Sequence, residues 1–301
     1  MPFEQPTIRP PSEWRSGLIR VTRGCNWNRC RFCGIYPHLA EPGFSIRSLT
    51  DIFHDIDFLS LHRPETEAIF LGDADPLQAG PAALIAIANY LYKVFPLQRL
   101  TCYARASTLK KIGKATIAEL AAAGLNRIHL GLESGNDEIL RYQRKGQSAK
   151  MVREIAGWLR EVRVELSVYV LLGLGGERLW QNHILATAEL LNDITPEFIR
   201  LRRLWLFPPS FSGPGCPLLN ETASGRFMPQ TAEGTVLELQ LLLQNLKAEG
   251  SFLTCDHENN YIKVEGMLQA DLKRMNDQVA AFLAQPIEAK EAHYLEIDAR
   301  I

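Results

Sequence analysis

The chain has 301 residues, of which 33 are Lys or Arg and 34 are Asp or Glu, so its formal net charge is −1. This length suffices for one large domain or two small ones, and the balanced charge argues against a nucleic-acid-binding tail or a basic membrane-binding patch. No apolar run is long enough to span a bilayer, and the first residues do not form a signal-peptide pattern. Three of the six cysteines are clustered, which is not typical of a disulfide framework. We expect a cytoplasmic protein without nucleic-acid or membrane partners.

Apolar strand patterns alternate with helical patterns along the first two thirds of the chain. Strands are predicted at 18–22, 67–72, 99–104, 127–131, 166–172 and 198–206, and helices at 48–62, 82–94, 109–123, 150–162 and 180–191. Six strands at about thirty-residue spacing imply a parallel sheet with right-handed crossovers. Six units are too few for a complete eight-stranded barrel, so we predict an α/β fold with a partial (βα)6 TIM-like barrel. A flat, doubly wound sheet is the alternative.

The two ends of the chain differ in composition from this central part. Residues 1–15 contain four prolines and are predicted to form an extended N-terminal arm. Residues 16–207 make up the predicted barrel. Residues 208–301 form a C-terminal helical extension that closes the barrel, with helices at 231–248 and 267–283 and a short strand that begins at residue 252.

Polar and glycine-rich segments follow the first five predicted strands. These segments are 24–36, 72–76, 105–107, 133–135 and 173–176. In both candidate architectures, function is expected at the carboxyl ends of the parallel strands. The sequence therefore predicts one site built from these five segments.

The segment after the first strand carries three cysteines within nine residues: Cys25, Cys30 and Cys33. Their thiolates can converge on one metal or cluster, because a Gly-flanked loop bends freely and soft sulfur suits iron or zinc. A [4Fe–4S] cluster held by three cysteines leaves one iron open, and Phe32 would shield its apolar side. The alternatives are a zinc site with His38 as fourth ligand and a chance grouping of buried thiols. The remaining thiols are far apart, which argues against a second cluster; they are Cys102, Cys216 and Cys255.

With the cysteine loop and the strand-end segments considered together, the chain resembles the radical S-adenosylmethionine (SAM) superfamily over roughly residues 15–207. The resemblance implies a [4Fe–4S] cluster on Cys25, Cys30 and Cys33, in a Cys-x4-Cys-x2-Cys variant of the family motif. It further implies that SAM chelates the open iron and is cleaved by the reduced cluster to methionine and a 5′-deoxyadenosyl radical, which abstracts hydrogen from a substrate. An electron donor such as flavodoxin or ferredoxin is implied as a partner. The overall pattern is most similar to the stand-alone Elp3 and coproporphyrinogen-dehydrogenase-like branch.

The resemblance also implies which residues contact SAM. The matching positions are Gly72, Asp73 and Asp75 for the amino group, Glu133 for the ribose, the backbone of Ile35, Tyr36 and Leu172 for the adenine, and Ser107, Arg144 or Lys145 for the carboxylate. Purely structural roles compete with two of these assignments. Either aspartate can cap a helix, and Glu133 can simply pair with Arg141 or Arg144.

The segment 256–261 reads Asp-His-Glu-Asn-Asn-Tyr and is similar to an Asn-His-x-x-Asn-Tyr element of the same branch. We predict that His257, Asn260 and Tyr261 contact a small-molecule or peptide substrate at the barrel mouth. The alternative is that these residues cap a helix and hold a turn. A non-catalytic zinc-binding module and an iron–sulfur electron carrier are the competing functions. The sequence does not identify the substrate.

Overall fold

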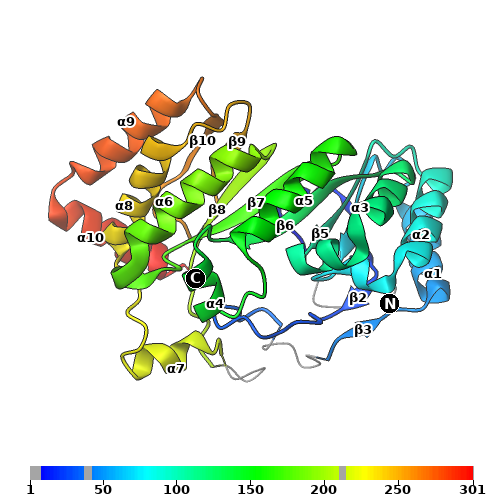
Figure 1. The fold of residues 1–301 in the computed structure, drawn as a ribbon, viewed down its shortest axis with the longest axis horizontal. Helices are drawn as coiled ribbons and strands as arrows, with labels where there is room; N and C mark the ends of the chain where they lie inside the picture. The colour runs from blue at the N-terminus through cyan, green and yellow to red at the C-terminus, as the bar shows by residue number, and fades with distance from the viewer. Residues whose placement is uncertain (1–7, 37–42, 210–214, 301) are drawn as a thin grey trace.

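The computed structural model describes residues 8–36, 43–209 and 215–300 and shows an open, curved sheet (Figure 1). The strand order is β1-β4-β5-β6-β7-β8-β9-β10, and the first and last strands do not pair with each other. All neighbouring strands run parallel except β9 and β10, which are antiparallel. The strands are β1 (Gly17–Arg20), β4 (Ala68–Gly72), β5 (Arg99–Ala104), β6 (Leu125–Glu133), β7 (Glu165–Leu172), β8 (Phe198–Arg203), β9 (Phe252–Cys255) and β10 (Val264–Met267). The predicted α/β fold with a partial barrel is confirmed.

Two strands of the sheet, β9 and β10, come from the predicted extension. β9 pairs in parallel with β8, with Ile199 opposite Leu253, and therefore adds a seventh parallel strand. We expected a short strand there but not its place in the sheet. A second sheet has only two strands, β2 (Thr22–Arg23) and β3 (Ser45–Ile46), and it flanks the cysteine loop.

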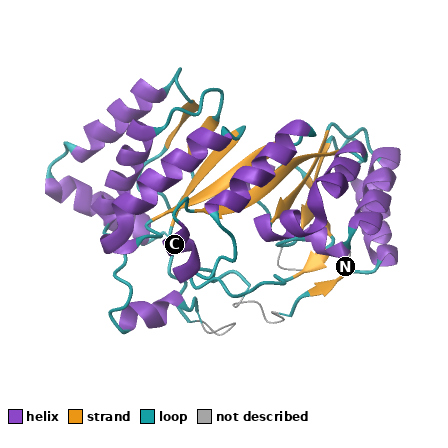
Figure 2. Cartoon of the chain, in the orientation of Figure 1, coloured by secondary structure: helices purple, strands orange, loops and turns teal. Residues whose placement is uncertain are grey.

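Most of the helices cover one face of the main sheet, whereas two short helices lie below the sheet in the same view (Figure 2). The covering helices pack side by side in chain order, because every right-handed crossover returns over the same face. The helices are α1 (Leu49–His62), α2 (Pro81–Val94), α3 (Ala106–Ala122), α4 (Asp137–Tyr142), α5 (Ala149–Glu161), α6 (Gly176–Ile194), α7 (Leu218–Ala223), α8 (Ala232–Asn245), α9 (Leu272–Leu283) and α10 (Ile287–Asp298). Two 3-10 turns, η1 (Pro11–Glu13) and η2 (Pro76–Ala79), precede β1 and α2. The short helices α4 and α7 and the terminal α10 were not predicted. No described helix is long and apolar enough to cross a membrane.

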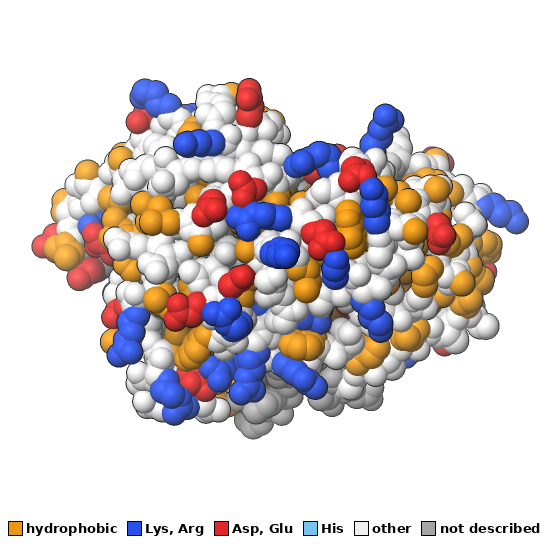
Figure 3. Space-filling model, viewed as in Figure 1, with side chains coloured by type: hydrophobic (Ala, Val, Ile, Leu, Met, Phe, Trp, Pro, Cys, Tyr) orange, Lys and Arg blue, Asp and Glu red, His pale blue; other side chains and the backbone are white. Residues whose placement is uncertain are grey.

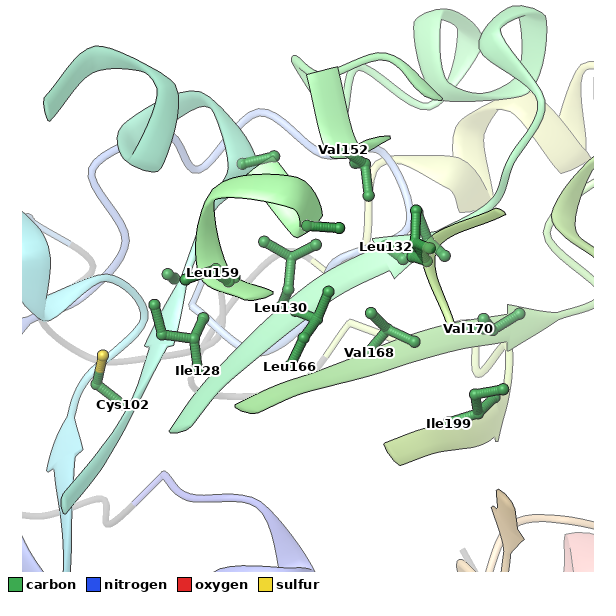
Figure 4. Packing of buried hydrophobic residues seen from close by; sticks show 14 of the residues in the cluster. Cys102, Ile128, Leu130, Leu132, Val152, Leu159, Leu166, Val168, Val170 and Ile199 are labelled. Carbon is green, nitrogen blue, oxygen red and sulfur yellow. The ribbon is translucent and has the colours of Figure 1, made fainter. Parts of the chain in front are cut away.

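The core lies between the sheet and these helices (Figure 4). Ile128 and Leu130 of β6 and Val168 of β7 are fully buried on the helical side of the sheet. Val152 and Leu159 of α5, seven residues apart on one helix face, pack in the same cluster. Each such side chain contributes about 1.5–3 kcal/mol of burial free energy.

The opposite face of the strands carries aromatic and polar side chains, since successive residues of a strand point to opposite faces. The rings of Tyr103, His129 and Tyr169 lie 6.1–6.3 Å apart, centroid to centroid. Glu13 of η1 is fully buried and bonds His129 Nε2 at 2.9 Å. Burial alone would raise the pKa of Glu13, but hydrogen bonds from His129 and Ser16 lower it to about 2. The described end of the predicted arm therefore fills the barrel interior at the amino ends of the strands.

Candidate active site

The cysteine loop begins directly after β2, at the carboxyl end of β1. Cys25, Cys30 and Cys33 are each half-buried. Burial raises the pKa of the Cys33 thiol to about 12, and the nearby Cys30 and Cys25 thiols act in the same direction. Burial also raises the pKa of Cys30, while Lys145 opposes this shift. The three thiols are thus electrostatically coupled in a poorly solvated loop that faces a lysine.

These residues fit an iron–sulfur cluster better than a single ion. The donors are soft sulfur atoms, and a nearby cation can offset the charge of their thiolates. In the described ranges, no three Cys, His, Asp or Glu side chains are placed to hold one metal ion. A cubane cluster does not need such convergence, because each cysteine binds a different iron. The alternative zinc site has no support from this geometry, and its fourth ligand, His38, lies outside the described residues.

Contacts from later parts of the chain hold the cysteine loop. The N–H of Arg31 donates to the carbonyl of Gln143 at 3.0 Å, and the N–H of Leu218 donates to the carbonyl of Arg31 at 2.8 Å. Phe32 packs against a small apolar cluster that includes Phe227. A Cβ on Gly34 would come within 2.3 Å of the Phe207 ring, so glycine permits this close packing. The segment after β8 therefore covers the loop.

The end of β4 supplies two buried aspartates with different surroundings. Asp73 forms an ion pair with Arg20 at 2.6 Å and accepts a hydrogen bond from the N–H of Gly24 at 3.3 Å. Asp75 accepts hydrogen bonds from Thr108 at 2.5 Å and Gln78 at 3.0 Å through Oδ2. Oδ1 of Asp75 is buried without a hydrogen-bond partner among the described residues. Asp73 therefore fixes the start of the cysteine loop, whereas Asp75 keeps an acceptor atom for another group.

The structure does not support the alternative in which Asp75 caps a helix through its side chain. Asp75 occupies the N-cap position of η2, but its side chain makes no capping hydrogen bond. Gly72 precedes Asp73 at the same strand end, with Leu18 packed closely against it. Burial raises the pKa of Asp75, and the hydrogen bonds from Thr108 and Gln78 oppose that shift.

At the end of β6, Glu133 is paired with a cation, but not with either arginine considered from the sequence. Its Oε1 lies 2.7 Å from Nζ of Lys145, and both side chains are about 10% exposed (11% and 10%). Arg144 is exposed instead. It has φ = 54° in the turn that ends α4, and this turn directs the next residue, Lys145, inward. Lys145 is therefore the member of the predicted basic pair that joins the other strand-end groups.

Arg105, at the end of β5, belongs to the predicted segment 105–107, but the sequence interpretation gave it no role of its own. It is 9% exposed and donates a hydrogen bond to the carbonyl of Lys145 at 2.8 Å. Its guanidinium lies 4.5 Å from the ring centroid of Trp27, and it interacts electrostatically with Cys30. The predicted Ser107 is half-buried in the first turn of α3, two residues further along. An arginine directly after a predicted strand was the available signal.

The predicted adenine segments lie at the same edge of the sheet. Tyr36 is 6% exposed, and its pKa is raised well above the usual value by burial and then by Asp73. Ile35 is 43% exposed. Leu172 ends β7, and Gly173 follows with φ = 85°, a conformation that favours glycine. The N–H of Gly173 donates to the buried carboxyl of Glu238 at 2.6 Å, so α8 holds this turn.

The predicted substrate residues divide into two groups. Asn260 donates through Nδ2 to the carbonyl of Leu201 at 3.1 Å, and the hydroxyl of Tyr261 donates to Asp298 at 3.0 Å. These bonds fit the alternative in which the segment holds a turn. His257 is half-buried and bonds Asn259 through Nδ1 at 2.5 Å. Burial lowers the pKa of His257, and Arg202 adds to this effect.

The inner face of the barrel provides further polar groups. Arg202 of β8 lies with its guanidinium 5.5 Å from the Tyr169 ring centroid and 3.5 Å from Asp256. Arg200, two residues earlier, donates to Ser167 at 3.0 Å. The Arg202–Asp256 ion pair therefore links β8 to the segment around residue 257.

The family model for the radical SAM superfamily matches residues 19–190, which is more than half of the chain. The chain belongs to the radical SAM superfamily. Members of this enzyme family use a [4Fe–4S] cluster and SAM, so the cofactors predicted from the sequence are confirmed at the level of the family.

Known proteins are similar to parts of this chain. The tRNA-2-methylthio-N(6)-dimethylallyladenosine synthase of Syntrophobacter fumaroxidans (strain DSM 10017 / MPOB) is 29% identical over 185 residues, covering 58% of this chain and 39% of that protein. Coproporphyrinogen III oxidase (HemN) from Escherichia coli, a radical SAM enzyme, has a TM-score of 0.56 at 14% identity, over 76% of this chain and 52% of its own. The radical SAM methyltransferase TsrM from Kitasatospora setae, with tryptophan and a SAM analogue bound, has a TM-score of 0.56 at 20% identity, over 71% and 40%.

These similarities support the fold of the chain but do not identify its substrate. At identities of 14% and 20%, the two structures support the fold of this chain. The chain spans 39% of the length of the curated relative. The substrates of these three proteins are therefore not assigned to this chain.

Proposed function

We propose that the chain binds one [4Fe–4S] cluster through Cys25, Cys30 and Cys33 and uses SAM to abstract hydrogen from a small-molecule or peptide substrate. The observation that carries the proposal is the common position of the cysteine loop, Asp75 and the Glu133–Lys145 pair at the carboxyl ends of the parallel strands. Together, the cluster and SAM would supply the 5′-deoxyadenosyl radical. The chain's own residues hold SAM and exclude water.

Three buried side chains have the chemistry to bind the polar groups of SAM. Oδ1 of Asp75, which has no hydrogen-bond partner in the part of the chain that the structure describes, is an acceptor for the SAM ammonium group. Glu133 is an acceptor for the ribose hydroxyls, and Lys145 can donate to the SAM carboxylate while it stays paired with Glu133. Ser107 and Arg144 are the other carboxylate candidates, and Lys145 is favoured over Arg144 because it is buried.

The adenine contacts are proposed for backbone groups at two loops. Ile35 and Tyr36 follow the last cysteine, and Leu172 ends β7 next to the turn held by Glu238. The half-buried Phe32 is proposed to cover the cluster on its apolar side, since it already packs in an apolar cluster.

We further propose that residues 208–301 act as the closing part of a barrel formed by residues 16–207. Its first part packs on the cysteine loop, and a radical site must be protected from water. Within the extension, His257 is the side chain proposed to contact substrate. Asn260 and Tyr261 would support that contact by fixing the segment to β8, as their hydrogen bonds suggest.

Anaerobic reconstitution tests the cluster. The wild type is expected to bind about four irons per chain and to absorb visible light, and a Cys25→Ala/Cys30→Ala/Cys33→Ala variant is expected to bind none. Cys102→Ala and Cys255→Ala are matched controls, because both thiols are buried and single, and they should retain the cluster. With a strong reductant, the wild type should convert SAM to methionine and 5′-deoxyadenosine. About eight irons per chain, or a cluster in the triple variant, would contradict the single-site proposal.

A further inference from the structure

Charged side chains on the outside of the molecule lie among charges of opposite sign. Figure 3 shows Asp and Glu side chains next to Lys and Arg side chains across the middle of the surface in view. Arg153 of α5, for example, pairs with Asp193 of α6 at 2.7 Å. Arg200 of β8 does not follow this pattern. Its chain neighbours Ile199 and Leu201 belong to the core, so Arg200 points to the inner face of the sheet.

Arg200 is a buried cation with unused hydrogen-bond donors. It is 7% exposed and forms no ion pair within the ranges that the structure describes. Its Nε donates to Oγ of Ser167 at 3.0 Å, but its two terminal nitrogens donate to no described residue. Burial lowers the pKa of Arg200, and the charges of Arg127 and Arg202 add to this effect. A buried charge is costly unless a group of opposite charge is bound beside it.

The strand register places two further polar side chains beside Arg200. Tyr169 of β7 and Thr254 of β9 are its partners in the two parallel ladders, so all three point to the inner face. Thr254 is 4% exposed, and its Oγ1 has no hydrogen-bond partner in the described part of the chain. A buried hydroxyl without a partner is unfavourable in the empty protein but available to a ligand.

Solvent reaches the inner face near the carboxyl ends of these strands. Tyr103, Tyr169 and Leu171 are only half-buried, although they lie on central strands whose opposite face is sealed by the core. The rings of Tyr103 and Tyr169 lie 6.3 Å apart, centroid to centroid, and the guanidinium of Arg202 lies 5.5 Å from the Tyr169 centroid. An aromatic surface is therefore next to Arg202 and its strand neighbour Arg200.

The charges at this position leave one positive charge in excess. Arg202 lies 3.5 Å from Asp256, which offsets one of the two arginines. Burial lowers the pKa of His257, and Arg202 adds to the shift, so this imidazole is neutral at pH 7. The neighbouring charged side chains are paired with each other: Glu133 with Lys145, Arg127 with Glu165, and Glu13 with Arg99. A group with a single negative charge is the best complement.

We propose that Arg200 and Arg202 bind a carboxylate of the substrate, which is therefore a small organic acid. The inference rests on the proposed function and names the class of molecule from which hydrogen is abstracted. Thr254 donates to the same carboxylate, and the body of the acid lies over the rings of Tyr103 and Tyr169. Arg200 stands two residues, about 7 Å, below Arg202 along β8, so a small acid reaches both arginines more readily than a polypeptide does.

Binding of known acids to the cluster-free protein tests the inference without the cofactor. The probes are phenylacetate, indole-3-acetate and hexanoate, each compared with its primary amide by isothermal titration calorimetry. At least one acid should bind at least tenfold more tightly than its amide, because a guanidinium pair favours the charged group. Arg200→Met and Arg202→Met should each weaken that acid at least tenfold. Arg163→Met removes an exposed arginine before β7 and should bind like the wild type.

Thr254→Val keeps the test decisive if an arginine variant does not fold. Its hydroxyl has no partner to lose among the described residues, so the denaturant midpoint should not fall, whereas acid affinity should fall about fivefold. Phenyl phosphate separates the two common sources of an anionic group. Binding of phenyl phosphate more tightly than every acid would overturn the carboxylate assignment.

Two other results would also overturn the inference. One is equal affinity for each acid and its amide, and the other is unchanged acid affinity in Thr254→Val and in every folded arginine variant. Cleavage of SAM by the reconstituted protein tests the proposed function separately. Acid binding without SAM cleavage would contradict the proposed function, and SAM cleavage without any preference for acids would contradict this inference alone.

Discussion

Glu133 and Lys145 form a buried ion pair, 2.7 Å from Oε1 to Nζ, in the space left by a residue without a side chain. A Cβ on Gly131 would lie 2.4 Å from Oε1 of Glu133 and 2.7 Å from Nζ of Lys145. Glu133 also has φ = 65°, which is uncommon for a residue other than glycine. Left-handed backbone of this kind costs roughly 1–3 kcal/mol and is concentrated at functional sites. The glycine at position 131, the positive φ of Glu133 and the ion pair with Lys145 therefore favour a single position for the Glu133 carboxylate.

Replacing either member of this pair should be more harmful than replacing both. Glu133→Gln or Lys145→Met leaves one buried group without its partner, and we expect each to lower the free energy of unfolding by about 3 kcal/mol. The double variant should recover part of this loss, with a coupling of about 0.5–3 kcal/mol. Denaturant unfolding of the four proteins measures the cycle. SAM affinity, measured in parallel, should stay low in the double variant; recovery to the wild-type value would exclude the proposed ribose contact.

Gly131→Ala is expected to disturb the same pair without changing any charge. Its new methyl group must displace Glu133 or Lys145, so SAM affinity should fall about tenfold or more, as for a lost hydrogen bond in a dry site. Gly157→Ala in α5 is the matched control, because a Cβ there meets nothing within 4 Å. The control should gain about 0.5–1 kcal/mol of stability through helix propensity and bind SAM normally. Equal SAM affinity in both variants would show that the position of the pair is not important.

Tyr261 and Tyr294 offer a test of the segment around residue 260. Their rings pack 4.8 Å apart, but only the hydroxyl of Tyr261 has partners, Asp298 and Arg203; that of Tyr294 has none among the described residues. Tyr261→Phe should lower the free energy of unfolding by about 1 kcal/mol, and Tyr294→Phe should be neutral or slightly stabilising. Both should keep iron content and SAM cleavage. Loss of SAM cleavage in a fully stable Tyr261→Phe protein would instead favour a direct catalytic role.

Local patterns were sufficient to predict the barrel and its cluster loop. The alternation that buries Ile128 and Leu130 is set by neighbours in the sequence, and so is the seven-residue spacing of Val152 and Leu159. The sheet position of β9 was not predictable in this way. Four residues give a weak strand signal, and pairing with β8 depends on chain segments about fifty residues apart.

The partner of Glu133 shows a second limit of sequence reasoning. Arg141, Arg144 and Lys145 are all cations within reach along the chain, and charge alone does not rank them. The turn after α4 decides, because φ = 54° at Arg144 places this residue outside and the next one inside. The contact between Trp27 and Arg105 was not predicted for a related reason. It joins two loops whose relative position depends on the whole sheet.

Because its pKa is raised, Glu238 should make the free energy of unfolding depend on pH, and Glu238→Gln should remove this dependence. Burial raises its pKa from 4.5 to about 7, although hydrogen bonds from the N–H of Gly173 and from Gln230 oppose the shift. Below pH 4.5 the carboxyl is protonated in both folded and unfolded chains, and no penalty arises. Between pH 4.5 and 7 the unfolded chain loses its proton first, so the folded state is progressively destabilised. Well above pH 7 the penalty is complete, at about 3 kcal/mol.

Glu238→Gln retains an acceptor for the Gly173 N–H but does not titrate. Its free energy of unfolding relative to the wild type should therefore rise by about 2.5 kcal/mol between pH 5 and pH 8, because only the wild type must bury a charge at the higher pH. Denaturant unfolding at both pH values measures this difference, and groups shared by the two proteins cancel. Glu249→Gln, at an exposed carboxyl, is the matched control and should show no such rise. A constant difference for Glu238→Gln would mean that water reaches this carboxyl, and α8 would then not seal the turn after β7.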